Sequence, residues 1–125
     1  MTTAEALQER GKKLFRQRDY EAAAQHFQQA LDAYREEGMR DMAAEMQTNI
    51  GLVHRAMGEN QQALDMMQEA LRTFQDLGDD LRIAQVLGNM GGVYAALGDN
   101  GESELRQALV SALTEAIDLV DGAVV

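Results

Sequence analysis

The chain repeats itself with a period of 40 residues, and this repeat constrains the fold more than any other feature of the sequence. Between residues 44–60 and 84–100, seven of the seventeen aligned positions are identical. Glycine at 11, 51 and 91 and alanine at 4, 44 and 84 carry the pattern back to the N-terminus. A period of this length is typical of stacked units that bury apolar surface against their neighbours.

Glycines at 38, 58, 78 and 98 divide the chain into segments of about twenty residues. Glycine accepts the left-handed conformation that ends a helix, and the Asp and Asn residues that follow, such as Asp41, Asn60 and Asp79, can cap the next helix. Proline is absent, so nothing interrupts long helices. The sequence therefore predicts an all-α protein with helices at roughly 3–17, 20–37, 40–57, 60–77, 80–97 and 101–120.

Short links between these helices make sequential helices antiparallel neighbours. The expected organisation is a single domain over residues 1–125. Its repeats span about 3–38, 40–78 and 80–120, followed by a tail at 121–125.

Gly51 lies in the middle of a predicted helix, where glycine costs about 1 kcal/mol relative to alanine. Gly11 and Gly91 repeat this choice, so something compensates for the cost. We expect the missing side chain to let the second helix of each pair approach closely. Ala63 and Ala70 are the small residues expected on that second helix.

These residues resemble the tetratricopeptide repeat, which places a glycine on the first helix and Ala–x3–Phe–x2–Ala on the second. The first repeat has Leu7, Gly11, Leu14, Ala23, Phe27 and Ala30, and the second has Ile50, Gly51, His54, Ala63, Met67 and Ala70. The third repeat has Leu87, Met90, Gly91 and Tyr94, then departs from the pattern with Ser103 and Gln107. The resemblance implies an α-solenoid of three antiparallel helix pairs, wound into a right-handed superhelix with a concave groove lined by the first helices.

Asn49 and Asn89 occupy the same position, two residues before the repeat glycine. The resemblance implies that this position faces the groove and hydrogen-bonds the main chain of an extended peptide. The alternative is an asparagine that serves local packing. Arg55, one helical turn beyond Asn49, is either a further groove residue or part of a solvent-exposed salt bridge.

Lys12 and Arg16 belong to a run of five cations between residues 10 and 18. They are four residues apart, so they share one helix face. By the resemblance this face borders the groove, where it can receive an acidic side chain or a carboxylate. The alternative is a solvated face that forms ion pairs with Glu5, Glu9 or Asp19.

The last predicted helix carries an apolar stripe of Leu105, Leu109, Leu113 and Ile117. A face this wide needs cover on two sides, and the sequence offers no further helix before Val125. We expect either that the chain is a fragment of a longer array or that the stripe forms a homodimer interface with a second copy.

Charge and composition narrow the classes of function. The formal net charge is -10, with seven basic and seven acidic residues in 1–40 and a strong acidic excess beyond. Nucleic-acid binding is disfavoured because it needs a basic surface. No stretch approaches the ~20 apolar residues of a membrane span, so a cytoplasmic protein is expected.

Neither catalysis nor metal binding is expected. The chain has no cysteine, and His26 and His54 lack partners at ligand spacing. No nucleophile–base pair or phosphate-binding loop is visible, so the prediction is no enzyme, no catalytic residue, no metal and no cofactor. The predicted function is a protein- or peptide-binding adaptor or scaffold, and the alternative is a self-assembling structural module.

Overall fold

The structure, a computed structural model, describes residues 2–98 together with residues 107, 110, 111 and 114. These residues form five α-helices and no strand: α1 (Ala4–Arg16), α2 (Tyr20–Glu36), α3 (Arg40–Ala56), α4 (Asn60–Leu77) and α5 (Asp80–Ala96). The five helices agree with the sequence prediction to within a residue or so at each end. Most of the predicted helix at 101–120, and the tail, lie outside the described residues, although 107, 110, 111 and 114 are helical.

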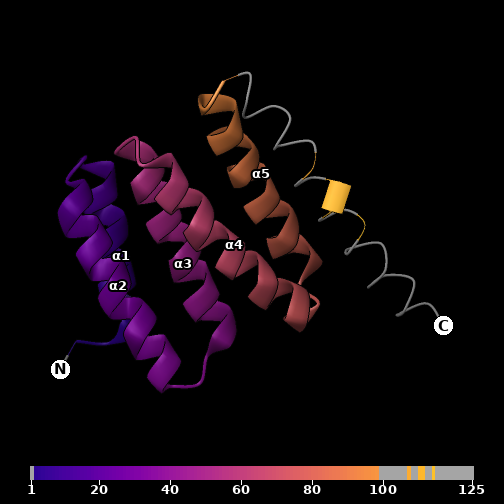
Figure 1. The fold of residues 1–125 in the computed structure, drawn as a ribbon. Coiled ribbons are helices and arrows are strands. Elements are labelled where there is room, and N and C mark those ends of the chain that lie inside the picture. The colour runs from indigo at the N-terminus through magenta and orange to yellow at the C-terminus, as the bar shows by residue number, and fades with distance from the viewer. Residues whose placement is uncertain (1, 99–106, 108–109, 112–113, 115–125) are drawn as a thin grey trace.

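Sequential helices pack against one another in chain order, so α1 and α2 lie at one side of the molecule and α5 at the other (Figure 1). The helix α3 packs against both α2 and α4 and also touches α5. This arrangement is the α-solenoid that the repeat predicted. The first helices of the pairs are α1, α3 and α5, and the second helices are α2 and α4.

The corners after α1 to α4 share one backbone geometry. Gly38, Gly58 and Gly78 have φ between 67° and 77°, and the N–H after each donates to a carbonyl five residues back. The corner after α1 has the same hydrogen bonds, but Arg18 takes the left-handed position with φ 63°. The predicted glycine stops are therefore correct, and the first corner uses the same stop without a glycine.

Among the described residues, the predicted capping by Asp or Asn occurs only at the start of α5. Asp79 accepts a hydrogen bond from the backbone N–H of Arg82 at 3.2 Å. At the start of α4 the cap position is Glu59, with Asn60 already the first residue of the helix, and at α3 the cap position is Met39, with Asp41 already inside the first turn. A residue inside the helix no longer has the non-helical backbone conformation from which a side chain caps the first turn.

Gly11 and Gly51 lie where helices cross, as predicted. A Cβ atom at Gly11 would lie 2.7 Å from the Phe27 ring, and one at Gly51 would lie 2.9 Å from Met67 and 3.1 Å from the Ala63 carbonyl. Such distances leave no room for a side chain. The close approach therefore compensates for the low helix propensity of glycine.

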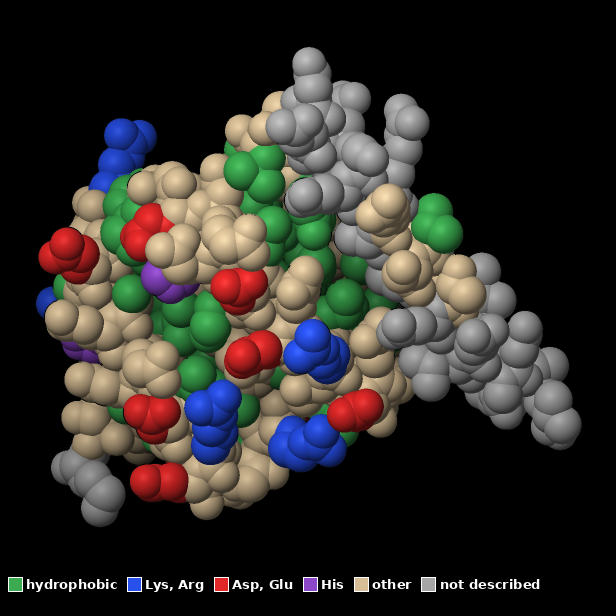
Figure 2. Space-filling model, in the orientation of Figure 1, with side chains coloured by type: hydrophobic (Ala, Val, Ile, Leu, Met, Phe, Trp, Pro, Cys, Tyr) green, Lys and Arg blue, Asp and Glu red, His purple; other side chains and the backbone are tan. Residues whose placement is uncertain are grey.

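The core consists of two apolar clusters joined through α3. One fills the space among α1, α2 and α3, with Phe27, Leu31, Tyr34 and Met46 buried in it. The other fills the space among α3, α4 and α5, with Met67, Phe74, Val86 and Val93 buried in it. On the face in Figure 2, apolar side chains reach the surface in patches between polar and charged ones.

No helix among the described residues is long and apolar enough to cross a membrane. The cytoplasmic location stays a prediction.

Candidate functional site

Two adjoining cavities lie along the first helices. The α1–α3 cavity has a volume of about 140 Å³ and is lined by Lys12, Phe15, Arg16, Phe27, Asn49 and Leu52. The α3–α5 cavity has a volume of about 300 Å³ and is lined by Glu45, Thr48, Asn49, Leu52, Phe74, Arg82, Gln85, Val86 and Asn89. Asn49 and Leu52 line both cavities, so we treat the two as one first-helix groove.

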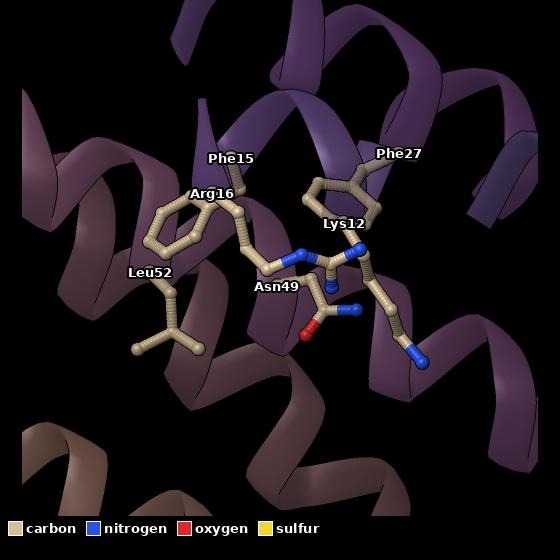
Figure 3. Close-up of a pocket in the computed structure, with 6 residues that line it drawn as sticks. All are labelled: Lys12, Phe15, Arg16, Phe27, Asn49 and Leu52. Atoms are coloured by element: carbon tan, nitrogen blue, oxygen red, sulfur yellow. The ribbon is translucent and has the colours of Figure 1, made fainter. Parts of the chain in front are cut away.

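The α1–α3 cavity has an apolar end and a polar end (Figure 3). The Phe15 ring and the Leu52 side chain lie together at one end, while the heads of Arg16 and Lys12 lie with the Asn49 amide at the other. Lys12 forms an ion pair with Glu9 at 3.3 Å. Among the described residues, Arg16 has no ion pair and no hydrogen bond from its side chain. This cavity therefore holds a free guanidinium beside apolar surface.

Four of the nine residues that line the α3–α5 cavity are uncharged and polar. Thr48, Asn49, Gln85 and Asn89 supply one hydroxyl and three amides, and Phe74 and Val86 supply apolar surface. The Thr48 hydroxyl donates to the Ala44 carbonyl of its own helix at 3.2 Å. The amides can donate to and accept from an uncharged polar chain such as a peptide backbone.

Arg82 is the charged centre of the α3–α5 cavity, and its charge is neutralised within the fold. Its guanidinium lies 2.9 Å from the Asp79 carboxylate, 3.5 Å from the Glu45 carboxylate and 5.9 Å from the centre of the Phe74 ring. The pKa of Asp79 is lowered, chiefly because its carboxylate accepts the Arg82 backbone N–H and then the Arg82 side chain. Arg82 therefore joins α5 to α3 and has little charge left for a ligand.

Arg55 of α3 lies against α5. A Cβ atom at Gly92 would lie 2.5 Å from its Nη1 atom and 2.8 Å from its Cζ atom. The guanidinium thus occupies the space that a side chain at position 92 would fill. No ion pair of Arg55 occurs among the described residues, and Arg55 lines neither cavity, so its role in the groove stays a prediction.

The structure brings together four of the five residues that the sequence analysis named for the groove. Lys12, Arg16 and Asn49 line the α1–α3 cavity, and Asn49 and Asn89 line the α3–α5 cavity. Arg55 lines neither cavity and lies against Gly92 of α5. The ion pair expected for the cationic face occurs with Glu9. Their role in binding stays a prediction. The residues named for a dimer interface, Leu105, Leu109, Leu113 and Ile117, lie outside the described residues.

Sequence reasoning missed several lining residues. Leu52 and Glu45 lie on the same face of α3 as Asn49, at spacings of three and four residues, so helical periodicity alone indicates both. Phe15 adjoins the named Arg16 and was overlooked. The Arg82–Glu45 pair carried no sequence signal, because its members belong to different repeats and no repeated residue marks them.

Known proteins with a similar sequence or fold agree with this architecture. The family model described as "Tetratricopeptide repeat" matches residues 42–116, more than half of the chain. The chain belongs to the tetratricopeptide repeat family. Members of this family act generally as protein-interaction adaptors or scaffolds and not as enzymes. No curated protein matches the sequence.

A solved structure with a similar fold is titled "Crystal structure of BtubC (BKLC) from P. vanneervenii". The superposition has a TM-score of 0.68 at 20% sequence identity and covers 96% of this tetratricopeptide repeat chain. It covers 56% of the other chain, so the present chain spans little more than half of that protein. At this identity the likeness shows the fold alone.

The described part of the chain contains no group of three or more histidine or acidic residues placed to hold a metal ion. The expected absence of a metal, a cofactor and a catalytic residue stays a prediction.

Proposed function

We propose that this chain is a protein-binding adaptor that holds an extended peptide segment of a partner in the first-helix groove. The observation that carries the proposal is the position of Asn49, which lines both cavities and so connects all three first helices. A ligand that touches Asn49 therefore has access to surface on either side. The family supports the broader role of interaction module, and the groove is the part of the proposal that needs a test.

The amides of Asn49 and Asn89 suit a peptide main chain. Both residues are half-buried, and neither makes a hydrogen bond from its side chain within the described part of the chain. An asparagine side chain offers both a donor and an acceptor, which matches the N–H and C=O of an extended segment. Two such residues forty positions apart would hold a segment that crosses from α3 to α5.

The experiment begins with capture of partners from the native host on the full chain, followed by peptide tiling of each captured protein. Fluorescence anisotropy then compares the parent with Asn49→Ala and Asn89→Ala. Each substitution should weaken binding of the tiled peptide by roughly 0.5–1.5 kcal/mol, the net value of one such hydrogen bond. Gln29→Ala is the matched control, since it removes an exposed amide from α2, away from the groove.

A peptide whose affinity is the same for the parent and for both asparagine variants would contradict the proposed site. Equal loss in Gln29→Ala would also contradict it, because the effect would then be unrelated to the groove.

We propose as a second function that the chain self-associates through its C-terminal segment. The sequence stripe of leucines and Ile117 supports this, as does Val110, an apolar residue that is 64% exposed. Light scattering of the full chain at micromolar concentration should give a dimer mass, and Leu109→Glu should give a monomer mass. A monomer mass for the parent, or a Leu109→Glu variant that stays dimeric, would contradict it.

A further inference from the structure

A further cavity lies on a different side of α3 from the first-helix groove. It has a volume of about 180 Å³, and we call it the corner cavity. Its lining includes Arg35 of α2, Gly38 at the corner, Arg40, Ala43 and Gln47 of α3, and Thr73 of α4. The α3 residues that line the groove are Glu45, Thr48, Asn49 and Leu52, which helical periodicity places on the other side of the helix. A ligand in the corner cavity therefore leaves the groove free.

The corner cavity departs from the 40-residue repeat at the positions that determine its chemistry. Four lining residues are more cationic, more polar or smaller than their equivalents in the next repeat: Arg35 for Gln75, Arg40 for Asp80, Gln47 for Leu87 and Ala43 for Ile83. Leu87 and Ile83 are buried core residues. Alanine in place of isoleucine leaves volume, and glutamine in place of leucine adds polar atoms. The cavity is therefore a property of this corner and not of the repeat as such.

Gln47 supplies a buried polar group to the corner cavity. Its side chain is only 7% exposed, and its Nε2 atom donates to the Glu69 carboxylate at 3.0 Å. A side-chain amide has two N–H groups, so the second has no partner within the described part of the chain. Leucine, the residue of the next repeat, would need no partner here. Gln47 therefore retains one donor for a ligand in the cavity.

The two arginines of the corner cavity also retain donors. Arg40 is the first residue of α3, where the helix dipole disfavours a positive charge. It forms an ion pair with Asp76 at 3.5 Å, but the two side chains are 61% and 70% exposed, and such a pair is weak. Arg35 forms no ion pair and no side-chain hydrogen bond with a described residue. Both guanidinium groups can therefore bind an anion.

We propose that the corner cavity binds a phosphoryl group, either as inorganic phosphate or as a phosphorylated side chain. The guanidinium groups of Arg35 and Arg40 donate to the phosphoryl oxygens, a geometry for which arginine is well suited. The Gln47 amide donates a further hydrogen bond. A phosphoryl group carries nearly two negative charges and three or more acceptor oxygens, so it can engage two arginines at once. This proposal goes beyond peptide binding and does not depend on it.

Acidic residues near the corner do not enter the cavity. Five of them adjoin the lining residues in sequence or contact them: Glu36, Glu37, Asp41, Glu69 and Asp76. All five are exposed, and none lines the cavity. Charges separated by more than about 8 Å are largely screened at physiological ionic strength. The donors inside the cavity therefore determine whether an anion binds.

The test is an NMR titration of the full chain, labelled with ¹⁵N, with sodium phosphate. Sodium chloride at the same ionic strength is the control for screening. Phosphate should cause saturable shifts at the backbone amides of Gly38 and Arg40 and at the side-chain amide of Gln47, and chloride should not. Phosphoserine with blocked termini distinguishes the two sources of the group, with blocked serine as its control. Tighter binding of phosphoserine than of phosphate would indicate a phosphorylated side chain, and equal or weaker binding would indicate free phosphate.

Substitutions assign the binding to the corner cavity. Arg35→Gln and Arg40→Gln should each weaken phosphate binding about tenfold or more, as for a hydrogen bond to a charged group. Gln47→Leu restores the residue of the next repeat and should weaken binding by a smaller factor, because it removes an uncharged donor. Arg10→Gln, at an exposed arginine of α1, is the matched control and should leave binding unchanged. Asn49→Ala should also leave it unchanged, since Asn49 lines the groove.

Thermal unfolding separates loss of binding from loss of structure. Arg40→Gln should unfold at the same temperature as the parent or higher, because it removes a cation from the first turn of a helix. Shifts that do not saturate, shifts confined to α1, or equal losses of binding in Arg10→Gln and Arg40→Gln would overturn the proposal. A parent that binds phosphate at the corner but no peptide in the groove would contradict only the proposed adaptor function.

Discussion

The first helices have two faces that differ in how strictly they repeat. The face against the second helix carries glycine at both described crossings, where a Cβ atom at Gly11 or Gly51 would overlap a neighbour. The groove face instead changes from Lys12 to Leu52 to Gly92. Close packing tolerates few residue types, whereas a position that borders a cavity accepts many. The glycines that repeat every 40 positions are therefore residues that pack between helices. Residues that differ between repeats, such as Lys12 and Leu52, line the groove, where they can determine which ligand binds.

The largest expected effect on stability comes from adding a side chain where two helices cross. Gly51→Leu would force a side chain into the space between Met67 and the Ala63 carbonyl, which lie 2.9 and 3.1 Å from the position of Cβ. The methionine can move, but the carbonyl belongs to the backbone of α4. We expect a loss of about 1–3 kcal/mol in the free energy of unfolding, measured by urea denaturation.

Gly88→Leu is the control for this substitution. A Cβ atom at Gly88 meets nothing within 4 Å, although the residue also lies in the middle of a helix. Its stability should equal or exceed that of the parent, because leucine has the higher helix propensity. A Gly51→Leu variant as stable as the parent would show that the crossing glycines are not required by packing.

The next effect compares two arginines on the groove side. Arg82→Ala removes the contacts with Asp79, Glu45 and the Phe74 ring and should cost about 1 kcal/mol, since each contact is partly exposed. Arg16→Ala should stay within about 0.5 kcal/mol of the parent. Urea denaturation of both variants measures the difference. Equal effects on stability would end the distinction between a structural and a free arginine.

The pH dependence of stability tests the contribution of Asp79, the carboxylate that binds Arg82. Because the folded state lowers the pKa of Asp79 below its ordinary value of 3.8, the Asp79 carboxylate stabilises the fold above that value. This contribution is lost as the pH falls through the lowered pKa. Asp79→Ala should therefore be less stable than the parent at pH 7, by about 1 kcal/mol as for other caps. The difference in the free energy of unfolding between the parent and Asp79→Ala should narrow below about pH 4 in urea titrations. A difference that does not change with pH would contradict a stabilising role for the Asp79 carboxylate.

The smallest effect concerns the corner after α1, where Arg18 adopts φ 63°. The left-handed conformation costs a residue with a side chain roughly 1–2 kcal/mol, and glycine avoids this at some cost in unfolded-state entropy. Arg18→Gly should therefore stabilise the fold by up to about 1 kcal/mol. Gln17→Gly, at a neighbouring position with φ -81°, should destabilise it. Thermal unfolding of the two variants distinguishes them, and a shift in the same direction would contradict the explanation.

Much of the fold could be predicted from the sequence. The glycine corners and the crossing at Gly51 follow from local rules: which residues end a helix, and which residue leaves room for a neighbour. The capping prediction is correct at Asp79 and wrong at Asp41 and Asn60, because these two residues lie inside the first turn of their helices. For the site, the repeat indicated Asn49 and Asn89 as equivalent positions, and helical spacing placed Lys12 and Arg16 on one face.

The sequence by itself determined the repeat, the helices, the corners and the glycine crossings, because each depends on residues close in sequence or on the 40-residue period. Only the tertiary structure decided which side chains meet across the first helices. Arg82 with Glu45 and Arg55 with Gly92 are both 37 residues apart, one helical turn short of the repeat. That offset is set by how far one first helix slides past the next when the core packs. A periodic sequence specifies that neighbouring repeats stack. The packing of the core fixes the register between the first helices, and this register decides that Arg82 is neutralised while Arg16 stays free.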